Sequence, residues 1–389
     1  MQSSHKQRDI GMSMKKIAWI TFNAFIDTDL YIVKELTSFY DIDWYIIKSG
    51  NDSYEFVDEI EALKSNSSLK ISMQQCGSRL RSPSCISFYR KLLAEISKSE
   101  PDVIYTSLAG APYYIPILAS SKDKDRVILA IHNVHVPKGG SAYWFFKFYN
   151  SLAVKSFRYY QTVSTDQYQL LNSMIPNKKV FCAPFILKDY GSARTKRTDR
   201  RITFLNFGNI RAYKRIDVLI EAVQRVYENT KVSMRVILAG KCEDWENYAK
   251  LIRYPELFDL RIHRIDNNDI PDLFAEADYF VAPYQDIAQS GSSVVAVNYG
   301  IPLIASRLPA FEEYVEDKVT GRLIEPANVD SLATVICDIV ESNNAGYDEM
   351  VDHLIQKREE LFSTESVVKR YREFIDGIIE EKASSSTCR

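Results

Sequence analysis

The sequence of 389 residues lacks any run of eighteen consecutive apolar residues, so it predicts no helix that spans a membrane. Its 6 cysteines are scattered and include no pair separated by two residues. This spacing argues against a zinc site and a disulfide framework, and it favours a reducing compartment. Residues 1–13 are polar and lack an apolar core, so we interpret them as a flexible tail and not as a signal peptide.

The overall composition is that of an ordinary soluble protein, with 46% hydrophobic and 26% charged residues. A chain of this length predicts two domains, or three. The net charge is only -2, but basic residues outnumber acidic ones in the first half and the reverse holds in the second. The basic first half suits an anionic partner or a membrane surface, although chance variation explains so small an excess equally well.

Short apolar segments alternate with amphipathic ones in both halves, which predicts parallel sheets covered by helices on both faces. The expected strands are 15–21, 43–48, 69–73, 101–107, 126–131, 159–164 and 179–185 in the first half, and 201–207, 234–239, 260–264, 278–282, 302–305 and 322–324 in the second. The predicted fold class is therefore α/β, with two Rossmann-like, doubly wound domains that face each other across a cleft.

A polar, charged segment divides the two halves and sets the expected domain boundaries. These are a tail at 1–13, a first domain at 14–187, a linker at 188–200, a second domain at 201–364, a helix at 365–382 and a tail at 383–389. The helix at 365–382 carries an apolar stripe that needs a partner, so we expect it to cross back and pack on the first domain.

Two turns in the second half have the features of an anion-binding site. Gly208 ends an apolar strand, and Arg211 and Lys214 stand close to the start of the following helix. Further along, residues 290–292 (Ser-Gly-Ser) lead into an apolar helix. Free N–H groups at a helix start, together with nearby cations, favour a phosphate. The alternatives are a solvated turn and a simple capping serine.

In order and spacing, five segments resemble the family-4 retaining glycosyltransferases of GT-B fold. They are GNIRAYKRIDVLIEA, RVILAGK, DIPDLFAEADYFVAPY, YGIPLIAS and FEEYVEDKVTGRLIEP. Two glutamates that are usual in this family are replaced by Ile287 and Val295, and the usual arginine after the glycine turn is Asn209. Residues 289–291 (Gln-Ser-Gly) resemble a subgroup with a Thr-Gln-Ser-Gly loop at this point. The glycine pair expected after the first strand is also missing.

The resemblance implies transfer of a sugar from a UDP- or GDP-sugar to a glycan or lipid-linked acceptor, with retention of configuration and without a metal or other cofactor. It implies catalytic roles for three residues, donor binding by seven more and weak contacts to the base by two. The three are His132, Arg211 and Lys214; the seven are Gly208, Asn209, Gln289, Ser290, Gly291, Ser292 and Glu313; the two are Asp266 and Asn268.

Several interpretations remain open at this stage. A sugar-nucleotide epimerase of the same fold would consume the donor without an acceptor, and a non-catalytic binder, suggested by the missing glutamates, would neither transfer nor hydrolyse it. We expect a cytoplasmic protein that makes surface polysaccharide or glycolipid and has no nucleic-acid partner. The aromatic segment 142–150 either packs in the core or docks on the inner face of the plasma membrane.

Overall fold

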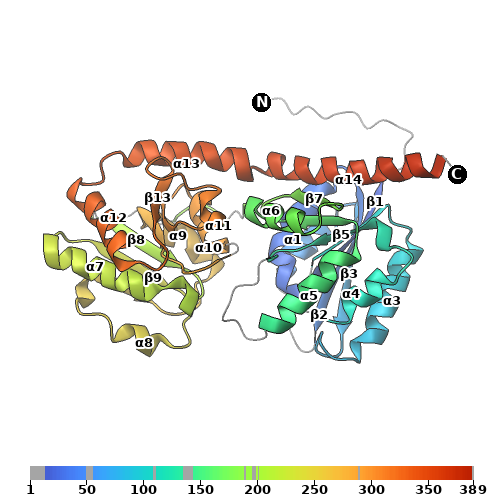
Figure 1. The fold of residues 1–389 in the computed structure, drawn as a ribbon, viewed down its shortest axis with the longest axis horizontal. Helices are drawn as coiled ribbons and strands as arrows, with labels where there is room; N and C mark the ends of the chain where they lie inside the picture. Colours follow the sequence, from blue (N-terminus) through green and yellow to red (C-terminus); the bar gives the residue numbers. More distant parts are fainter. Residues whose placement is uncertain are drawn as a thin grey trace.

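The computed structural model describes residues 14–49, 56–107, 111–134, 143–187, 190–194, 199, 201–287 and 290–387. Two parallel sheets, each with helices on both faces, form two domains that lie side by side (Figure 1). Both therefore have the α/β, Rossmann-like architecture that the alternating pattern predicts. The tail expected at 1–13, much of the linker and Gln289 lie outside the described residues. The tail expected at 383–389 is instead helical as far as Thr387, and only 388–389 of it lie outside the described residues.

The first sheet has seven strands in the order β3-β2-β1-β4-β5-β6-β7. The strands are β1 (Lys16–Phe22), β2 (Asp41–Ser49), β3 (Leu69–Cys76), β4 (Val103–Ser107), β5 (Val127–Ala130), β6 (Tyr159–Thr162) and β7 (Lys179–Cys182). The helices are α1 (Ile26–Leu36), α2 (Val57–Leu63), α3 (Cys85–Lys98), α4 (Tyr114–Ala119), α5 (Tyr143–Ser156) and α6 (Thr165–Met174). Strand order reverses beside β1, so the carboxyl end of β1 is the switch point where such sheets bind ligands.

The second sheet has six strands in the order β10-β9-β8-β11-β12-β13. They are β8 (Thr203–Phe207), β9 (Arg235–Ala239), β10 (Phe258–Arg261), β11 (Tyr279–Ala282), β12 (Leu303–Ser306) and β13 (Gly321–Ile324). The helices are α7 (Ile216–Thr230), α8 (Trp245–Ala249), α9 (Ile270–Ala275), α10 (Gly291–Asn298), α11 (Pro309–Glu312) and α12 (Val329–Glu341). The switch point lies at the carboxyl end of β8, next to Gly208.

Some expectations about single elements need correction. The strand expected at 260–264 runs instead from Phe258 to Arg261, because its pairing with β9 begins at Phe258 opposite Val236. Helix α13 (Tyr347–Phe362) was not expected from the sequence, since it buries only Leu354 and Phe362 and so has little apolar periodicity.

The last helix, α14 (Thr364–Thr387), follows α13: Figure 1 shows α13 along the second domain and α14, in red, along the first. Its apolar side chains join the core on one face of the first sheet: they are Val367, Val368, Tyr371, Ile375 and Ile378. Polar contacts reinforce this packing, since Tyr40 donates a hydrogen bond to Asp376 at 2.7 Å and Lys382 donates one to the Asp102 carbonyl at 2.9 Å. The chain therefore returns to its first domain after completing the second.

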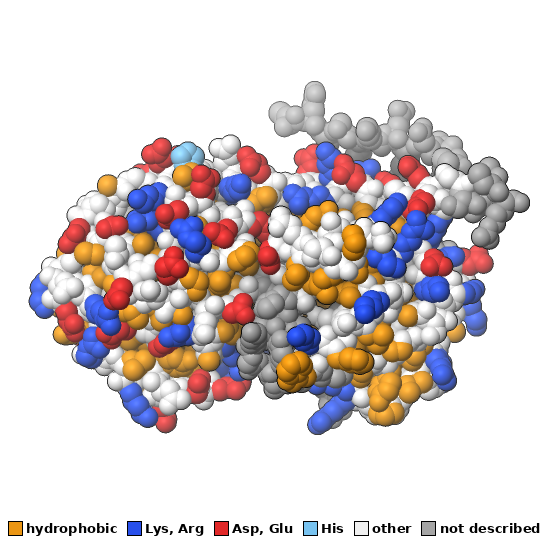
Figure 2. Space-filling view, in the orientation of Figure 1, with side chains coloured by type: hydrophobic (Ala, Val, Ile, Leu, Met, Phe, Trp, Pro, Cys, Tyr) orange, Lys and Arg blue, Asp and Glu red, His pale blue; other side chains and the backbone are white. Residues whose placement is uncertain are grey.

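Helix α5 presents an apolar and basic face to solvent. Trp144 and Phe148 are 75% and 73% exposed, and Leu152, one turn further along, is 41% exposed. The exposed Lys147 and Lys155 lie beside this stripe, and α5 contains no acidic residue. Figure 2 shows orange and blue side chains together in this region. Within the described ranges, no helix has both the length and the apolarity that crossing a membrane requires.

Candidate functional site

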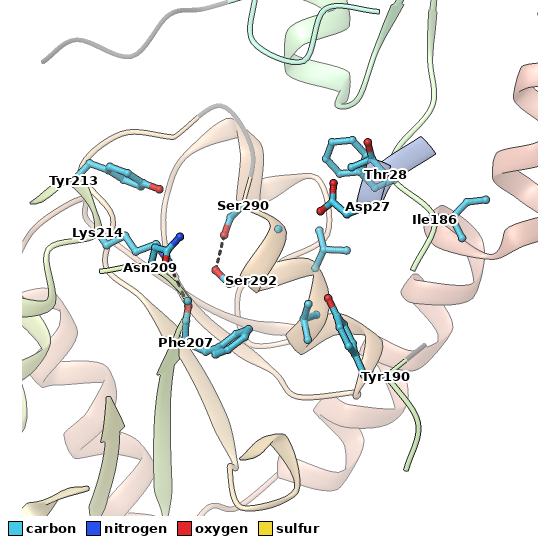
Figure 3. A pocket seen from close by; sticks show the side chains of 15 residues that line it. Asp27, Thr28, Ile186, Tyr190, Phe207, Asn209, Tyr213, Lys214, Ser290 and Ser292 are labelled. Carbon is cyan, nitrogen blue, oxygen red and sulfur yellow. Dashed lines mark hydrogen bonds between the residues drawn. The ribbon is translucent and has the colours of Figure 1, made fainter. Parts of the chain in front are cut away.

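A cavity of about 410 Å³ lies between the two domains, at the carboxyl ends of β1 and β8 (Figure 3). Both switch points thus open into one space, as expected for two doubly wound sheets that face each other. The first domain lines it with Asp27, Thr28, Phe185 and Ile186, and Tyr190 of the linker adds to this wall. The second domain contributes Phe207, Gly208, Asn209, Tyr213, Lys214, Ser290, Gly291, Ser292, Val294 and Val295.

Gly208 brings the two predicted anion-binding turns together. Its φ of +101° lies in the left-handed region, which an L side chain rarely adopts. A Cβ at this position would lie 3.2 Å from Lys214 Nζ and 3.5 Å from Ser292 Cβ. The cation from one βα unit and the helix start from another therefore meet over the bare Gly208 backbone.

Lys214 is a buried cation that faces this cavity. It is 5% exposed, and its Nζ donates a hydrogen bond to the Phe207 carbonyl at 3.3 Å and lies 5.6 Å from the centre of the Tyr284 ring. Burial lowers the pKa of Lys214, and the neighbouring Tyr213 partly opposes this effect. No ion pair joins Lys214 to a carboxylate in the described parts of the chain. Because an unpaired buried charge is costly, this lysine is suited to an incoming anion.

The start of α10 supplies hydroxyl groups beside Lys214. Ser290 caps the helix, since its Oγ accepts hydrogen bonds from the Ser293 backbone N–H at 3.3 Å and from the Ser293 hydroxyl at 2.8 Å. The Ser292 hydroxyl lies 3.3 Å from Ser290 Oγ and 3.4 Å from the Tyr284 hydroxyl. First-turn N–H groups have no partner within their own helix, so they complete a cradle for anionic oxygens.

His132, for which the family resemblance implies a catalytic role, is not among the residues that line this cavity. Its ring lies between those of Phe25 and Phe185, at centroid distances of 4.7 Å and 5.5 Å. Burial lowers the pKa of His132 to about 4, although the negative charge of Asp27 partly opposes this. The imidazole is therefore neutral at neutral pH and lies behind the Phe185 wall.

Four other predicted residues also lie away from the cavity. Arg211 is exposed and pairs with Glu243 at 3.5 Å. Asp266 and Asn268 are also exposed, the first just before and the second within the single-turn helix that precedes α9. Glu313, just after α11, instead bridges the domains, because its carboxylate accepts hydrogen bonds from the Thr165 hydroxyl at 2.8 Å and the Thr165 N–H at 3.2 Å. Burial raises the pKa of Glu313, and its bonds with Thr165 act in the opposite direction.

Sequence reasoning missed the cavity residues of the first domain and the linker. Asp27 and Thr28 lie in the first turn of α1, within six residues of the end of β1, so their position near a switch point was the available signal. No pattern pointed to Phe185, Ile186 and Tyr190, because the domain interface alone brings them to the site. Val295 does line the cavity, where the family resemblance places a glutamate. Among the described residues, no three metal-ligating side chains gather closely enough to hold an ion.

Comparison with known proteins shows a family likeness in the second domain and a likeness of fold over the whole chain. Residues 201–342, which include the second-domain wall, match the family model of the group 1 glycosyl transferases. No curated protein sequence matches the chain significantly. Among solved structures, a glycosyltransferase from Rickettsia africae is 18% identical with a TM-score of 0.74, covering 95% of this chain and 99% of its own. Sucrose-phosphate synthase from Thermosynechococcus elongatus is 12% identical with a TM-score of 0.72, covering 94% and 100%.

A third similar structure holds a ligand. HepE from Anabaena, in complex with UDP-glucose, is 15% identical with a TM-score of 0.64, and the match covers 95% of this chain and 99% of HepE. These likenesses extend over both domains, so the chain has the GT-B fold.

Proposed function

We propose that this protein is a retaining, metal-independent glycosyltransferase that takes a sugar from a nucleoside diphosphate sugar. The observation that carries this proposal is the meeting of Lys214 and the α10 start over Gly208, inside a cavity between the domains. A buried cation beside free helix N–H groups favours a diphosphate. The proposal is consistent with the group 1 match of the second domain and with the UDP-glucose bound by HepE.

The geometry suggests how the chain would promote transfer. As the bond between the sugar's anomeric carbon and the phosphate oxygen breaks, its electron pair moves to the diphosphate, while the acceptor oxygen forms the new bond and its proton passes to a phosphate oxygen. Lys214 and the helix dipole would stabilise the growing negative charge more than the ground state, which is the requirement for catalysis. Both groups are held in place before the substrate arrives, since one is buried and the other is backbone.

A direct test uses the UDP- and GDP-sugars as donors. We expect the purified chain to bind at least one of them and to transfer the sugar to a glycan or lipid-linked acceptor, with the anomeric configuration retained and with activity surviving chelation of divalent metals. Conversion of the donor to another sugar nucleotide without an acceptor would instead identify an epimerase. Binding without any turnover would identify a non-catalytic binder, the candidate that the missing glutamates at Ile287 and Val295 suggest.

We also propose that the exposed face of α5 contacts an anionic lipid surface, which would bring lipid-linked acceptors to the cavity. An apolar stripe with flanking lysines is the pattern of a helix that lies in a membrane interface. In sedimentation assays, the chain should bind vesicles that contain phosphatidylglycerol and not vesicles of phosphatidylcholine alone. The double substitution Trp144→Ser and Phe148→Ser should abolish this binding. Leu260→Ser, at an exposed leucine of the second domain, is the control.

A further inference from the structure

Asp27 places a negative charge on the wall opposite the anion cradle. It stands in the first turn of α1, the helix that follows the central strand β1 after the single helical turn Asn23–Phe25, and its side chain is half-buried. Figure 3 shows its carboxylate directed into the cavity, towards the side of Ser290 and Ser292. Among the described residues that line the cavity, Asp27 is the one carboxylate. The two walls of the site therefore carry opposite charge, with Lys214 on the second domain and Asp27 on the first.

This arrangement restricts what can lie between the two walls. A diphosphate held by Lys214 and the α10 start would face the Asp27 carboxylate across the cavity, and like charges repel each other. A carboxylate accepts hydrogen bonds and donates none, so the groups that suit it are neutral donors. The hydroxyl groups of a hexose attached to the diphosphate fit this requirement, because charge-assisted hydrogen bonds to a carboxylate are among the stronger ones.

We propose that Asp27 binds hydroxyl groups of the transferred sugar and so makes the site select a sugar nucleotide over the free nucleoside diphosphate. This inference rests on the proposed function, because it takes the diphosphate to occupy the cradle of Lys214 and Ser292. It has a consequence for turnover. Once the sugar has left, the diphosphate faces Asp27 with no hydroxyl groups between them, so the same carboxylate that holds the donor weakens binding of the nucleotide product.

A purely structural role for Asp27 is the competing explanation. An acidic residue in the first turn of a helix interacts favourably with the helix dipole, and this effect is confined to the helix end. Asp58 offers a matched control, because it also stands in the first turn of a helix of the same domain, is exposed and does not line the cavity. Replacing either aspartate by asparagine removes the same charge from a helix start, but only Asp27 should affect ligand preference.

The experiment measures the preference ratio, defined as the dissociation constant of UDP divided by that of UDP-glucose, by calorimetry. GDP and GDP-mannose form a second pair, and the pair that binds the wild type is used. Asp27→Asn should lower the ratio about tenfold, as loss of one charge-assisted hydrogen bond implies. It should weaken binding of the sugar nucleotide and strengthen binding of the free nucleotide. Asp27→Ser should change the ratio in the same direction, and Asp58→Asn should leave it unchanged.

The possible outcomes distinguish a failure of this inference from a failure of the proposed function. A ratio within twofold of the wild-type value in both Asp27 variants, with UDP or GDP still bound, would overturn the role of Asp27 and leave the proposed donor site intact. An equal loss of affinity for both ligands would also overturn it, because a general loss of structure lowers both affinities. Failure of the wild type to bind either pair would refute the proposed function itself. Thermal unfolding of each variant checks that the fold is retained.

Discussion

Lys214→Ala tests whether the buried ammonium group of Lys214 binds a diphosphate. Lys214 is 5% exposed, and its Nζ donates a hydrogen bond to a neutral carbonyl, that of Phe207. In the free protein, the substitution removes a charge whose burial is unfavourable, so we expect the melting temperature to stay level or to rise. In the complex, it removes a charge-assisted hydrogen bond worth about 1.5–3 kcal/mol, which corresponds to about tenfold to hundredfold weaker binding of UDP.

The assay compares UDP with uridine by calorimetry, in the wild type and in Lys214→Ala. Because uridine carries no phosphate, its affinity should hardly change, while the affinity for UDP falls. Lys250→Ala, at an exposed lysine after α8, controls for a general loss of positive charge. Equal effects on both ligands, or none on either, would refute the reasoning and make Lys214 a structural lysine.

Binding should also depend on pH through the same residue. Burial places the folded-state pKa of Lys214 below its ordinary value. In the free protein, the unfolded chain therefore keeps this proton to higher pH than the folded one, so stability should rise as pH increases through that interval. Affinity for UDP should change in the opposite direction, falling as Lys214 loses its charge. The difference in UDP affinity between wild type and Lys214→Ala should accordingly narrow at alkaline pH.

Three further predictions concern residues around the site. His132 has a folded pKa of about 4 against an ordinary 6.5, so stability should fall as pH drops from about 6.5 to 4, and chemical denaturation should show that His132→Gln removes this dependence. Tyr371→Ala removes a buried ring that packs 5.2 Å from Phe181, so it should lower the free energy of unfolding by about 3–5 kcal/mol; a loss below 1 kcal/mol would mean that α14 contributes little. Glu313→Gln weakens the carboxylate contact with the α6 N-terminus, so small-angle scattering should show a larger radius of gyration, and an unchanged radius would contradict a role in domain closure.

The fold was largely readable from the sequence. Buried parallel strands are continuously apolar and helices are periodic, and both signals are local, so most elements appear within two or three residues of their expected bounds. The apolar stripe of α14 likewise predicted that this helix packs against another part of the protein. Helix α13 was not predicted because few of its side chains are buried, and a mostly exposed helix has little apolar periodicity in its sequence.

The candidate site was readable only in part. Gly208, Lys214 and Ser292 belong to turns whose residue types carry the anion-binding chemistry, so sequence reasoning could select them. Arg211 looked equivalent to Lys214 on the same grounds. The structure separates them, because Lys214 extends over Gly208 while Arg211 turns outward to Glu243. His132 lies behind a phenylalanine wall that no local pattern reveals.

By itself, the sequence determined the two α/β sheets and the residue types of the anion-binding turns, because helix and strand formation and turn chemistry depend on neighbours along the chain. Tertiary structure alone decided which residues meet across the cavity. Asp27 and Lys214 are separated by most of the first domain in sequence, and only the facing of the two sheets brings them to opposite walls of one space. The opposed charges of the site arise from this packing, since a side chain's local sequence specifies neither its burial nor its distant partners.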